Sequence, residues 1–309
     1  MKMKVNKYRT NTCGELTISD LGKNVVLSGF VQTIRDHGGV MFLDLRDHAG
    51  ITQVVVHDES MLEGVSKETV IKVTGEVIRR DEETVNTKLL TGEIEIKCES
   101  LEVLSPKAHT LPFEIDGMQE VNEEVRLKYR YLDMRSKKIS NNIKLRSDVL
   151  HYLRNKMYDL GFTEVQTPIL TVSSPEGARD FVVPSRKFKG KFYALPQAPQ
   201  IYKELLMVGG VDKYFQVAPC FRDEDSRKDR TLEFYQLDME MSYVTEDDVL
   251  EVGEEIFYDV FSKFSNKEVS PRPFRRIAYK EAMDSYGSDK PDLRNPLIIK
   301  DASKVLEHT

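Results

Sequence analysis

The residues best suited to chemistry stand where an apolar strand passes into a charged segment, in "YFQVAPCFRDEDSRKDRTLEFYQLD". Arg222 follows the apolar run directly, and an arginine in that place can hold a phosphate with its planar fork of donors. Glu224 shares its face and can accept a hydrogen bond from an exocyclic amine, while Phe234 on the returning strand can stack on a purine. The pattern predicts two antiparallel strands joined by a charged loop. The alternative is a solvated hairpin, which charge density alone favours.

A second candidate is the strand "VMFLDLRD", in which strict alternation places Phe42 on the same face as Asp44 and Arg46. An aromatic ring on a polar face gains from a stacked single-stranded base, by about 1–3 kcal/mol per base. Arg35 before the "DHGG" turn can contact a phosphate, and Gln53 on the next strand can hydrogen-bond a base edge. An ordinary surface phenylalanine explains Phe42 equally well, so both interpretations stay open.

The elements that position these residues fall into two groups. Residues 24–104 read as five short β-rich segments separated by turn formers, with one helical candidate at 59–67, which predicts a small barrel of the OB type. The connector "LSPKAHTLPFEIDG" follows and shows no periodicity. From residue 142 the apolar residues recur at helical spacing until Gly161, and strands then alternate with helices. Thr245 and Asp248 form a capping box that opens a further helix.

We therefore expect an α+β chain with an OB-fold domain at 1–105, a hinge or linker at 106–137 and an antiparallel-sheet domain at 138–309. Arg126 to Arg146 is rich in lysine and arginine, which indicates either a solvated basic helix or a hinge facing phosphates.

Composition limits the possible functions. The chain has 309 residues and a net charge of −6, which argues against indiscriminate nucleic-acid binding over the whole surface. Its three cysteines lack metal-ligand spacing, so no metal site is expected, and a reducing, cytoplasmic location fits. No apolar run approaches membrane-spanning length. A Walker A loop, a dinucleotide glycine fingerprint and a nucleophile elbow are all missing, so any nucleotide must be held without them.

Longer motifs resemble a known family. "GFTEVQTPIL" is similar to motif 1 of class II aminoacyl-tRNA synthetases, and "FRDEDSRKDRTLEFYQLDMEM" is similar to their motif 2. The strings between them, "SSPEGARDFVVPSR" and "FYALPQAPQIYKELLMVGGVDKYFQVAPCFRDED", closely resemble aspartyl-tRNA synthetases of bacterial type. The resemblance runs from "CGEL" to "YGSDKPDLR" and so covers nearly the whole chain.

The resemblance implies an anticodon-binding OB barrel followed by a class II catalytic domain. It implies ATP and Mg²⁺, L-aspartate and tRNA(Asp) as ligands, and a homodimer formed through motif 1. Arg222 is the implied catalytic residue, bridging the α-phosphate and the substrate carboxylate. The other implied site residues are, for aspartate, Glu176, Gln200, Lys203, Arg222 and Gln236; for ATP, Arg222, Asp223, Glu224 and Phe234; and for the anticodon, Arg35, His37, Phe42 and Gln53.

Three expectations depend on details of the resemblance. His37 resembles enzymes that charge both tRNA(Asp) and tRNA(Asn), although a plain turn residue is the alternative. The third family motif, with its second ATP-holding arginine, finds no match here. We therefore expect an amino-terminal portion of an aspartate–tRNA ligase, inactive by itself. The competing hypotheses are a non-catalytic module that binds tRNA or single-stranded nucleic acid, and a paralogue that makes an amino acid, against which the barrel weighs.

Overall fold

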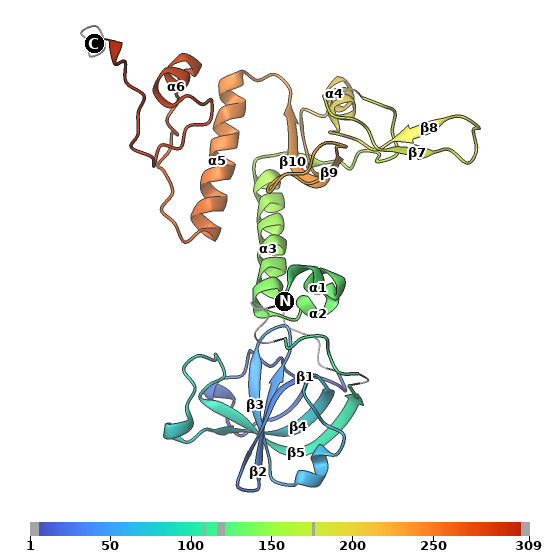
Figure 1. Ribbon diagram of the computed structural model, residues 1–309, viewed down its shortest axis with the longest axis vertical. Coiled ribbons are helices and arrows are strands. Elements are labelled where there is room, and N and C mark those ends of the chain that lie inside the picture. The colour runs from blue at the N-terminus through green and yellow to red at the C-terminus, as the bar shows by residue number, and fades with distance from the viewer. Residues whose placement is uncertain (1–5, 108, 116–120, 175–176, 304–309) are drawn as a thin grey trace. The chain divides into compact units, whose positions relative to one another are not determined.

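The computed structural model describes residues 6–107, 109–115, 121–174 and 177–303 (Figure 1). The chain divides into two compact units, Met1–Asn141 and Asn142–Thr309. None of the helices within these described ranges is long and apolar enough to cross a membrane.

The first unit contains the predicted barrel. Its strands are β1 (Asn24–His37), β2 (Val40–Arg46), β3 (Ile51–Val56), β4 (Val70–Arg79) and β5 (Ile94–Ser105). They close in the order β1-β2-β3-β5-β4, which confirms the five-stranded prediction. Three short 3₁₀ turns accompany them: η1 (Ile18–Asp20), η2 (Glu59–Leu62) and η3 (Glu82–Thr84). The helix expected at 59–67 is therefore only the single turn η2.

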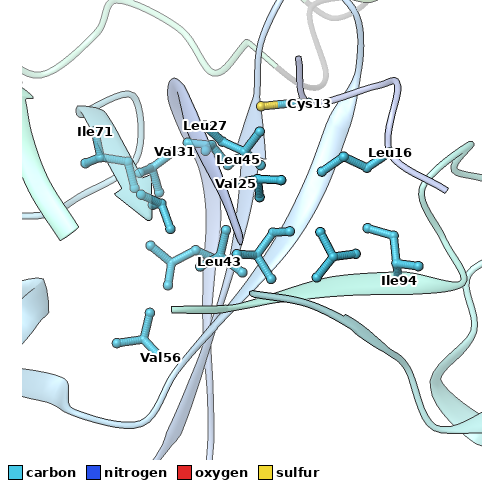
Figure 2. Close-up of a cluster of buried hydrophobic side chains, with 14 residues drawn as sticks. Cys13, Leu16, Val25, Leu27, Val31, Leu43, Leu45, Val56, Ile71 and Ile94 are labelled. Atoms are coloured by element: carbon cyan, nitrogen blue, oxygen red, sulfur yellow. The ribbon is translucent and has the colours of Figure 1, made fainter. Parts of the chain in front are cut away.

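Alternation along the strands builds the barrel core. Leu43 and Leu45 of β2 are fully buried, while Phe42 and Asp44, which alternate with them, lie on the outer face. Figure 2 shows the inward side chains, whose full set is Cys13, Leu16, Val25, Leu27, Val31, Leu43, Leu45, Val54, Val56, Ile71, Val73, Val77, Ile94 and Ile96. Because the inner positions are filled by apolar side chains, ligands can be met only from the outer face or the loops.

Glycine is required where β4 crosses β5. The register between these strands shifts between Thr74 and Gly75. A Cβ at Gly75 would lie 2.2 Å from the carbonyl oxygen of Lys97, so only glycine fits this close backbone approach.

A polar cluster fastens the connector to the barrel. After α1 (Glu123–Lys128) and α2 (Arg130–Asp133), Arg135 donates to Glu68 at 2.7 Å, and Arg46 of β2 donates to the other oxygen at 2.6 Å. The Arg135 guanidinium also lies 4.2 Å from the ring centroid of Phe30. Glu68 is held at φ 66, an uncommon conformation for glutamate. Part of the basic stretch after residue 126 thus pairs with acids inside the unit.

The second unit is built on a three-stranded sheet in the order β10-β9-β6. Its elements are α3 (Lys137–Asp159, which begins in the first unit), β6 (Thr163–Glu164), β7 (Val182–Pro184), β8 (Phe192–Ala194), α4 (Gln200–Val208), β9 (Lys213–Phe221), β10 (Glu233–Met241), α5 (Glu246–Phe264) and α6 (Tyr279–Tyr286). β6 runs parallel to β9, whereas β10 is antiparallel to it, and β7 and β8 form a separate hairpin.

One face of this sheet packs into the core of the unit. Phe215 of β9 lies with Leu237 and Met239 of β10 against Met157 of α3 and Ile256 of α5. The predicted capping box is confirmed: the Thr245 backbone donates to Asp248 at 2.7 Å, and the Asp248 backbone donates to Thr245 Oγ1 at 3.4 Å. The other sheet face is therefore left for polar residues.

Candidate active site

The polar sheet face carries several of the predicted site residues. In the antiparallel register Phe234 lies opposite Cys220, Gln236 opposite Ala218, and Asp238 opposite Gln216. Paired residues project to the same side of a sheet, and alternation continues this face through Phe234, Gln236, Asp238 and Glu240. Arg222 continues the opposite strand, where its backbone N–H donates to the Leu232 carbonyl at 2.8 Å.

The charged loop after β9 surrounds a pocket of about 500 Å³. The residues that line it are Arg222, Glu224, Arg227, Asp229, Arg230, Thr231 and Phe234. The Arg222 guanidinium lies 5.0 Å from the ring centroid of Phe234. Glu224 pairs with Arg230 at 3.5 Å, and the Asp223 backbone N–H donates to the Arg179 carbonyl at 3.0 Å. Three cations beside an aromatic ring suit an anionic nucleotide.

Lys203 reaches this face from the first turn of α4, which begins after Pro199. Its ammonium lies 3.0 Å from Asp238 Oδ1 and 3.2 Å from Glu240 Oε2. Burial by itself would lower the pKa of Lys203, but the hydrogen bonds and charges of Asp238 and Glu240 outweigh burial and raise it. Lys203 is therefore a fixed cation held by two carboxylates of its own chain, which the motif comparison did not anticipate.

Two buried polar atoms lie beside this pair. They are the Tyr214 hydroxyl and Asp238 Oδ2. Burial and then the neighbouring charge of Asp238 raise the pKa of Tyr214, so the phenol stays neutral. A hydrogen bond between the Tyr214 hydroxyl and the Asp238 carboxylate also raises that pKa, so the two groups face each other in a buried, polar part of the site.

The two glutamines predicted to hold aspartate are placed differently. Gln236 lies on the sheet face, where its Oε1 accepts from Cys220 Sγ at 3.3 Å. Gln200 opens α4 and donates to Glu204 at 2.7 Å. Glu176 lies outside the described residues.

Gln197 was missed by the sequence analysis. It is 1% exposed, and its Nε2 donates to the Ala178 carbonyl at 3.1 Å and the Ser174 carbonyl at 3.3 Å, as well as to Asp180. Hydrogen bonds from Ser173 and Gln197 lower the pKa of Asp180. Gln197 thus ties both ends of the segment that carries Glu176 to the start of α4. The sequence offered one signal for this role, a glutamine flanked by prolines in the string "PQAPQ".

On the barrel, the four residues predicted to read a nucleic acid lie on adjoining strands. Arg35 stands opposite Phe42, and Asp44 opposite Gln53. The His37 ring packs edge-on to Phe42 with centroids 5.5 Å apart.

Their hydrogen-bonding groups are already engaged. Arg35 donates to both oxygens of Asp44, at 2.7 and 2.9 Å, and to Gln53 Oε1 at 3.2 Å. Gln53 is 7% exposed and donates to Glu95 at 2.7 Å. Burial raises the pKa of Glu95, although Gln53 and Arg80 oppose the effect. A base edge can be bound here only by exchanging partners within this network.

Comparison with known proteins agrees with both units. The family model of class II tRNA synthetases (D, K and N) matches residues 122–307, and the model of the OB-fold nucleic acid binding domain matches residues 25–104. Proteins named aspartate–tRNA(Asp/Asn) ligase from Pelagibacter ubique and Phenylobacterium zucineum are 57% and 58% identical over 97% and 96% of this chain. The chain spans about half, 51%, of the length of each.

Solved structures give the same result. Asparaginyl-tRNA synthetase from Pyrococcus horikoshii, complexed with asparaginyl-adenylate, matches 89% of this chain and 66% of its own, with a TM-score of 0.75 and 28% identity. Aspartyl-tRNA synthetase from Entamoeba histolytica matches 87% of this chain and 61% of its own, with a TM-score of 0.71 and 25% identity. The resemblance seen in the motifs is thereby confirmed, and the chain belongs to the class II tRNA synthetases of the D, K and N group, with an OB-fold nucleic acid binding domain before the catalytic fold.

Proposed function

We propose that the protein containing this chain is an aspartate–tRNA ligase, which activates L-aspartate with ATP and transfers it to the 3′ end of tRNA(Asp). The observation that carries the proposal is the single sheet face on which the Arg222–Phe234 pocket adjoins the Lys203–Asp238 pair. The names of the relatives support the choice of aspartate.

Arg222 performs the central task. In the first step a carboxylate oxygen of aspartate attacks the α-phosphorus of ATP in line, the bond to the β-phosphate oxygen breaks, and pyrophosphate leaves. The charge that accumulates on the phosphate oxygens must be neutralised, and a guanidinium at the pocket wall does so without contributing a covalent bond. A ribose hydroxyl of the tRNA then attacks the acyl carbon and displaces AMP. Neither step requires a side-chain nucleophile.

Phe234 provides one wall for the purine. Arg222 lies over this ring in the structure, so a stacked adenine must take the ring face and move the guanidinium toward the phosphates. Glu224 is placed to accept from the adenine amine once it leaves Arg230, and the Asp223 backbone holds the loop to Arg179.

Mg²⁺ is proposed to enter with the nucleotide. No group of three His, Cys, Asp or Glu side chains that could hold a metal occurs within the described ranges, whereas the pocket lining offers the carboxylate of Asp229. One or two carboxylates together with substrate phosphates are the usual ligands of Mg²⁺. Bound there, it would neutralise phosphate charge.

The aspartate end of the site is assigned to Lys203. Asp238 and Glu240 together outweigh its single positive charge, so a substrate carboxylate must displace one of them, while the substrate ammonium is attracted to the carboxylate released. Gln200 and Gln236 border this position, and Glu176 is the proposed partner of the substrate ammonium from its loop.

The barrel is proposed to bind the anticodon. Phe42 stacks on an unpaired base, while Arg35 and Gln53 turn from Asp44 and Glu95 toward phosphate and base. His37 beside Phe42, together with relatives named for both tRNAs, supports tRNA(Asn) as a second substrate.

A homodimer and a cytoplasmic location are also proposed. Exposed Ile169, Leu170 and Val172 follow the proline of motif 1 and favour a homodimer. A cytoplasmic location is proposed because protein synthesis takes place there.

Pyrophosphate exchange dependent on aspartate and ATP tests the enzyme. In the protein that carries this chain, Arg222→Lys is expected to lower the exchange rate by about 10²–10³-fold, because a lysine cannot reproduce the bidentate fork. Lys280→Met, an exposed site far along the chain on α6, is the matched control and should leave the rate unchanged. Exchange that persists unchanged in Arg222→Lys would contradict the role of Arg222.

Anticodon binding separates the enzyme from a non-catalytic binding module. Phe42→Ala should weaken binding of an anticodon stem-loop about five-fold or more, and Arg222→Ala should not change it. Stem-loop binding combined with complete absence of exchange in the full protein would favour the binding module.

A further inference from the structure

A strongly basic segment of the second unit has no part in the site described above. In "SRKFKGKF", four of the six residues 186–191 are lysine or arginine, and no acidic residue occurs from Phe181 to Lys203. The chain as a whole carries a net charge of −6, so this cluster of positive charge is opposite in sign to the net charge of the chain. None of Arg186, Lys187, Lys189 and Lys191 pairs with an acid of the described ranges.

The structure gives this segment a defined shape. We call residues 182–194 the basic hairpin: β7 pairs with β8 from Val182–Ala194 to Pro184–Phe192. The connecting loop is closed by Ser185 N–H to the Lys191 carbonyl at 2.9 Å and Lys191 N–H to the Phe188 carbonyl at 3.1 Å, and Gly190 takes a φ of 74. In Figure 1 the loop extends away from α4 at the end of the yellow hairpin.

Two aromatic rings stand between the charges. Phe188 is 53% exposed and Phe192 is 60% exposed. The Lys187 ammonium lies 5.5 Å from the Phe188 ring centroid. A surface of exposed rings interleaved with cations can bind a single-stranded nucleic acid, because the bases stack on the rings and the phosphates contact the ammonium groups. A hairpin with this loop is partly pre-organised, so less entropy is lost on binding.

The base of the hairpin is tied to the nucleotide pocket. The Leu195 backbone donates to the Phe181 carbonyl at 2.8 Å, and the Arg179 carbonyl accepts from Asp223, next to Arg222. Arg186 is seven residues from Arg179, so its backbone lies at most ~25 Å away even in a fully extended chain. A polynucleotide whose end occupies the pocket would therefore pass within reach of the hairpin.

We infer that the basic hairpin binds the acceptor arm of the tRNA, by phosphate contacts from Lys187, Lys189 and neighbouring cations and by stacking of an unpaired base on Phe188. The inference rests on the proposed function, because it assumes that an RNA end enters the pocket. A second copy of this chain fits less well, since a two-fold contact would bring four cations of one copy against four of the other.

The test compares two RNA probes on the protein that contains this chain. One is an acceptor-stem minihelix ending in an unpaired 3′ strand, and the other is an anticodon stem-loop. Lys187→Ala/Lys189→Ala should weaken minihelix binding roughly ten-fold at low salt and reduce the slope of log K against log salt by about 1–2. Phe188→Ala should weaken minihelix binding about five-fold or more with little change in the slope. Anticodon stem-loop binding should be unchanged in both variants.

Lys267→Ala/Lys280→Ala removes the same charge from exposed sites elsewhere in the unit and should alter neither probe. Stem-loop binding by the wild type with minihelix binding unchanged in the hairpin variants overturns the inference and leaves the proposed function standing. Failure of the wild type to bind either RNA overturns the proposed function and the inference with it. Sedimentation gives a further outcome: if the hairpin variants lose self-association while minihelix binding is unaffected, the hairpin is an interface between copies and the inference is wrong.

Discussion

Glu68 offers the sharpest test of how the connector is attached to the barrel. Its side chain is 8% exposed and lies between Arg46, which is 11% exposed, and Arg135, which is 27% exposed. Glu68→Gln removes the charge while keeping the length of the side chain and the same backbone strain at φ 66. The two guanidinium groups then face each other without the carboxylate that separates them.

The magnitude follows from burial. Breaking a buried ion pair by neutralising one partner costs about 3–5 kcal/mol. Water reaches Arg135 and screens that half of the cluster, so we expect a loss of about 2–3 kcal/mol in the free energy of unfolding of the first unit. With a urea m-value of about 2 kcal/mol/M, the midpoint should fall by about 1–1.5 M.

The assay must report the barrel by itself, because the chain forms two compact units and multi-domain proteins need not unfold in one transition. The chain has no tryptophan, so hydrogen exchange of β1 and β4 peptides, measured at increasing urea by mass spectrometry, is the suitable signal. Glu114→Gln is the control in the same unit: its pair with Lys67 is 73% and 53% exposed, and its loss should change stability by at most ~0.5 kcal/mol. If Glu68→Gln shifts the midpoint no more than this control, the cluster does not stabilise the connector and the reasoning fails.

Two further predictions concern the same kind of measurement. Gly75→Ala should lower the free energy of unfolding by more than about 2 kcal/mol, because its Cβ would meet the Lys97 carbonyl at 2.2 Å. At Gly253, inside α5, an added Cβ would have no neighbour within 4 Å, so Gly253→Ala should instead raise the free energy of unfolding by about 0.5–1 kcal/mol. A loss of stability in both variants would refute the steric explanation. Burial raises the pKa of Glu95 above its ordinary value of 4.5, so stability from this group is present below that value and is lost as the pH rises through the folded-state pKa. The stability of Glu95→Gln relative to the wild type should therefore increase as the pH rises from about 4.5 through the folded-state pKa, and a constant difference in urea midpoint would contradict the shift.

Much of the site could be predicted from alternation. In "EFYQLDMEM", Phe234, Gln236 and Asp238 fall on one face and Leu237 and Met239 on the other, and the structure follows this division. The barrel could also be predicted from the sequence, because its turns and short β-rich segments are local signals.

The partners of Lys203 and Gln53 could not be predicted in the same way. Lys203 comes from α4 and meets Asp238 across 35 residues, which no periodicity encodes. Gln53 sits on a strand where alternation permits either exposure or burial, and its contacts with Arg35 and Glu95 depend on how three strands close the barrel. Such choices are decided by tertiary packing and by the cost of leaving a buried amide unpaired.

The position of β10 at the edge of its sheet affects handling of the protein. Within the described residues, β10 has a strand neighbour only on the side of β9, so its outer row of backbone N–H and C=O groups can template pairing with another chain. The net charge of −6 opposes such pairing between copies. The repulsion between copies weakens as the pH approaches the sequence pI of about 5.7 and as salt rises. Storage above neutral pH and at modest ionic strength should therefore keep concentrated samples free of edge-to-edge aggregates.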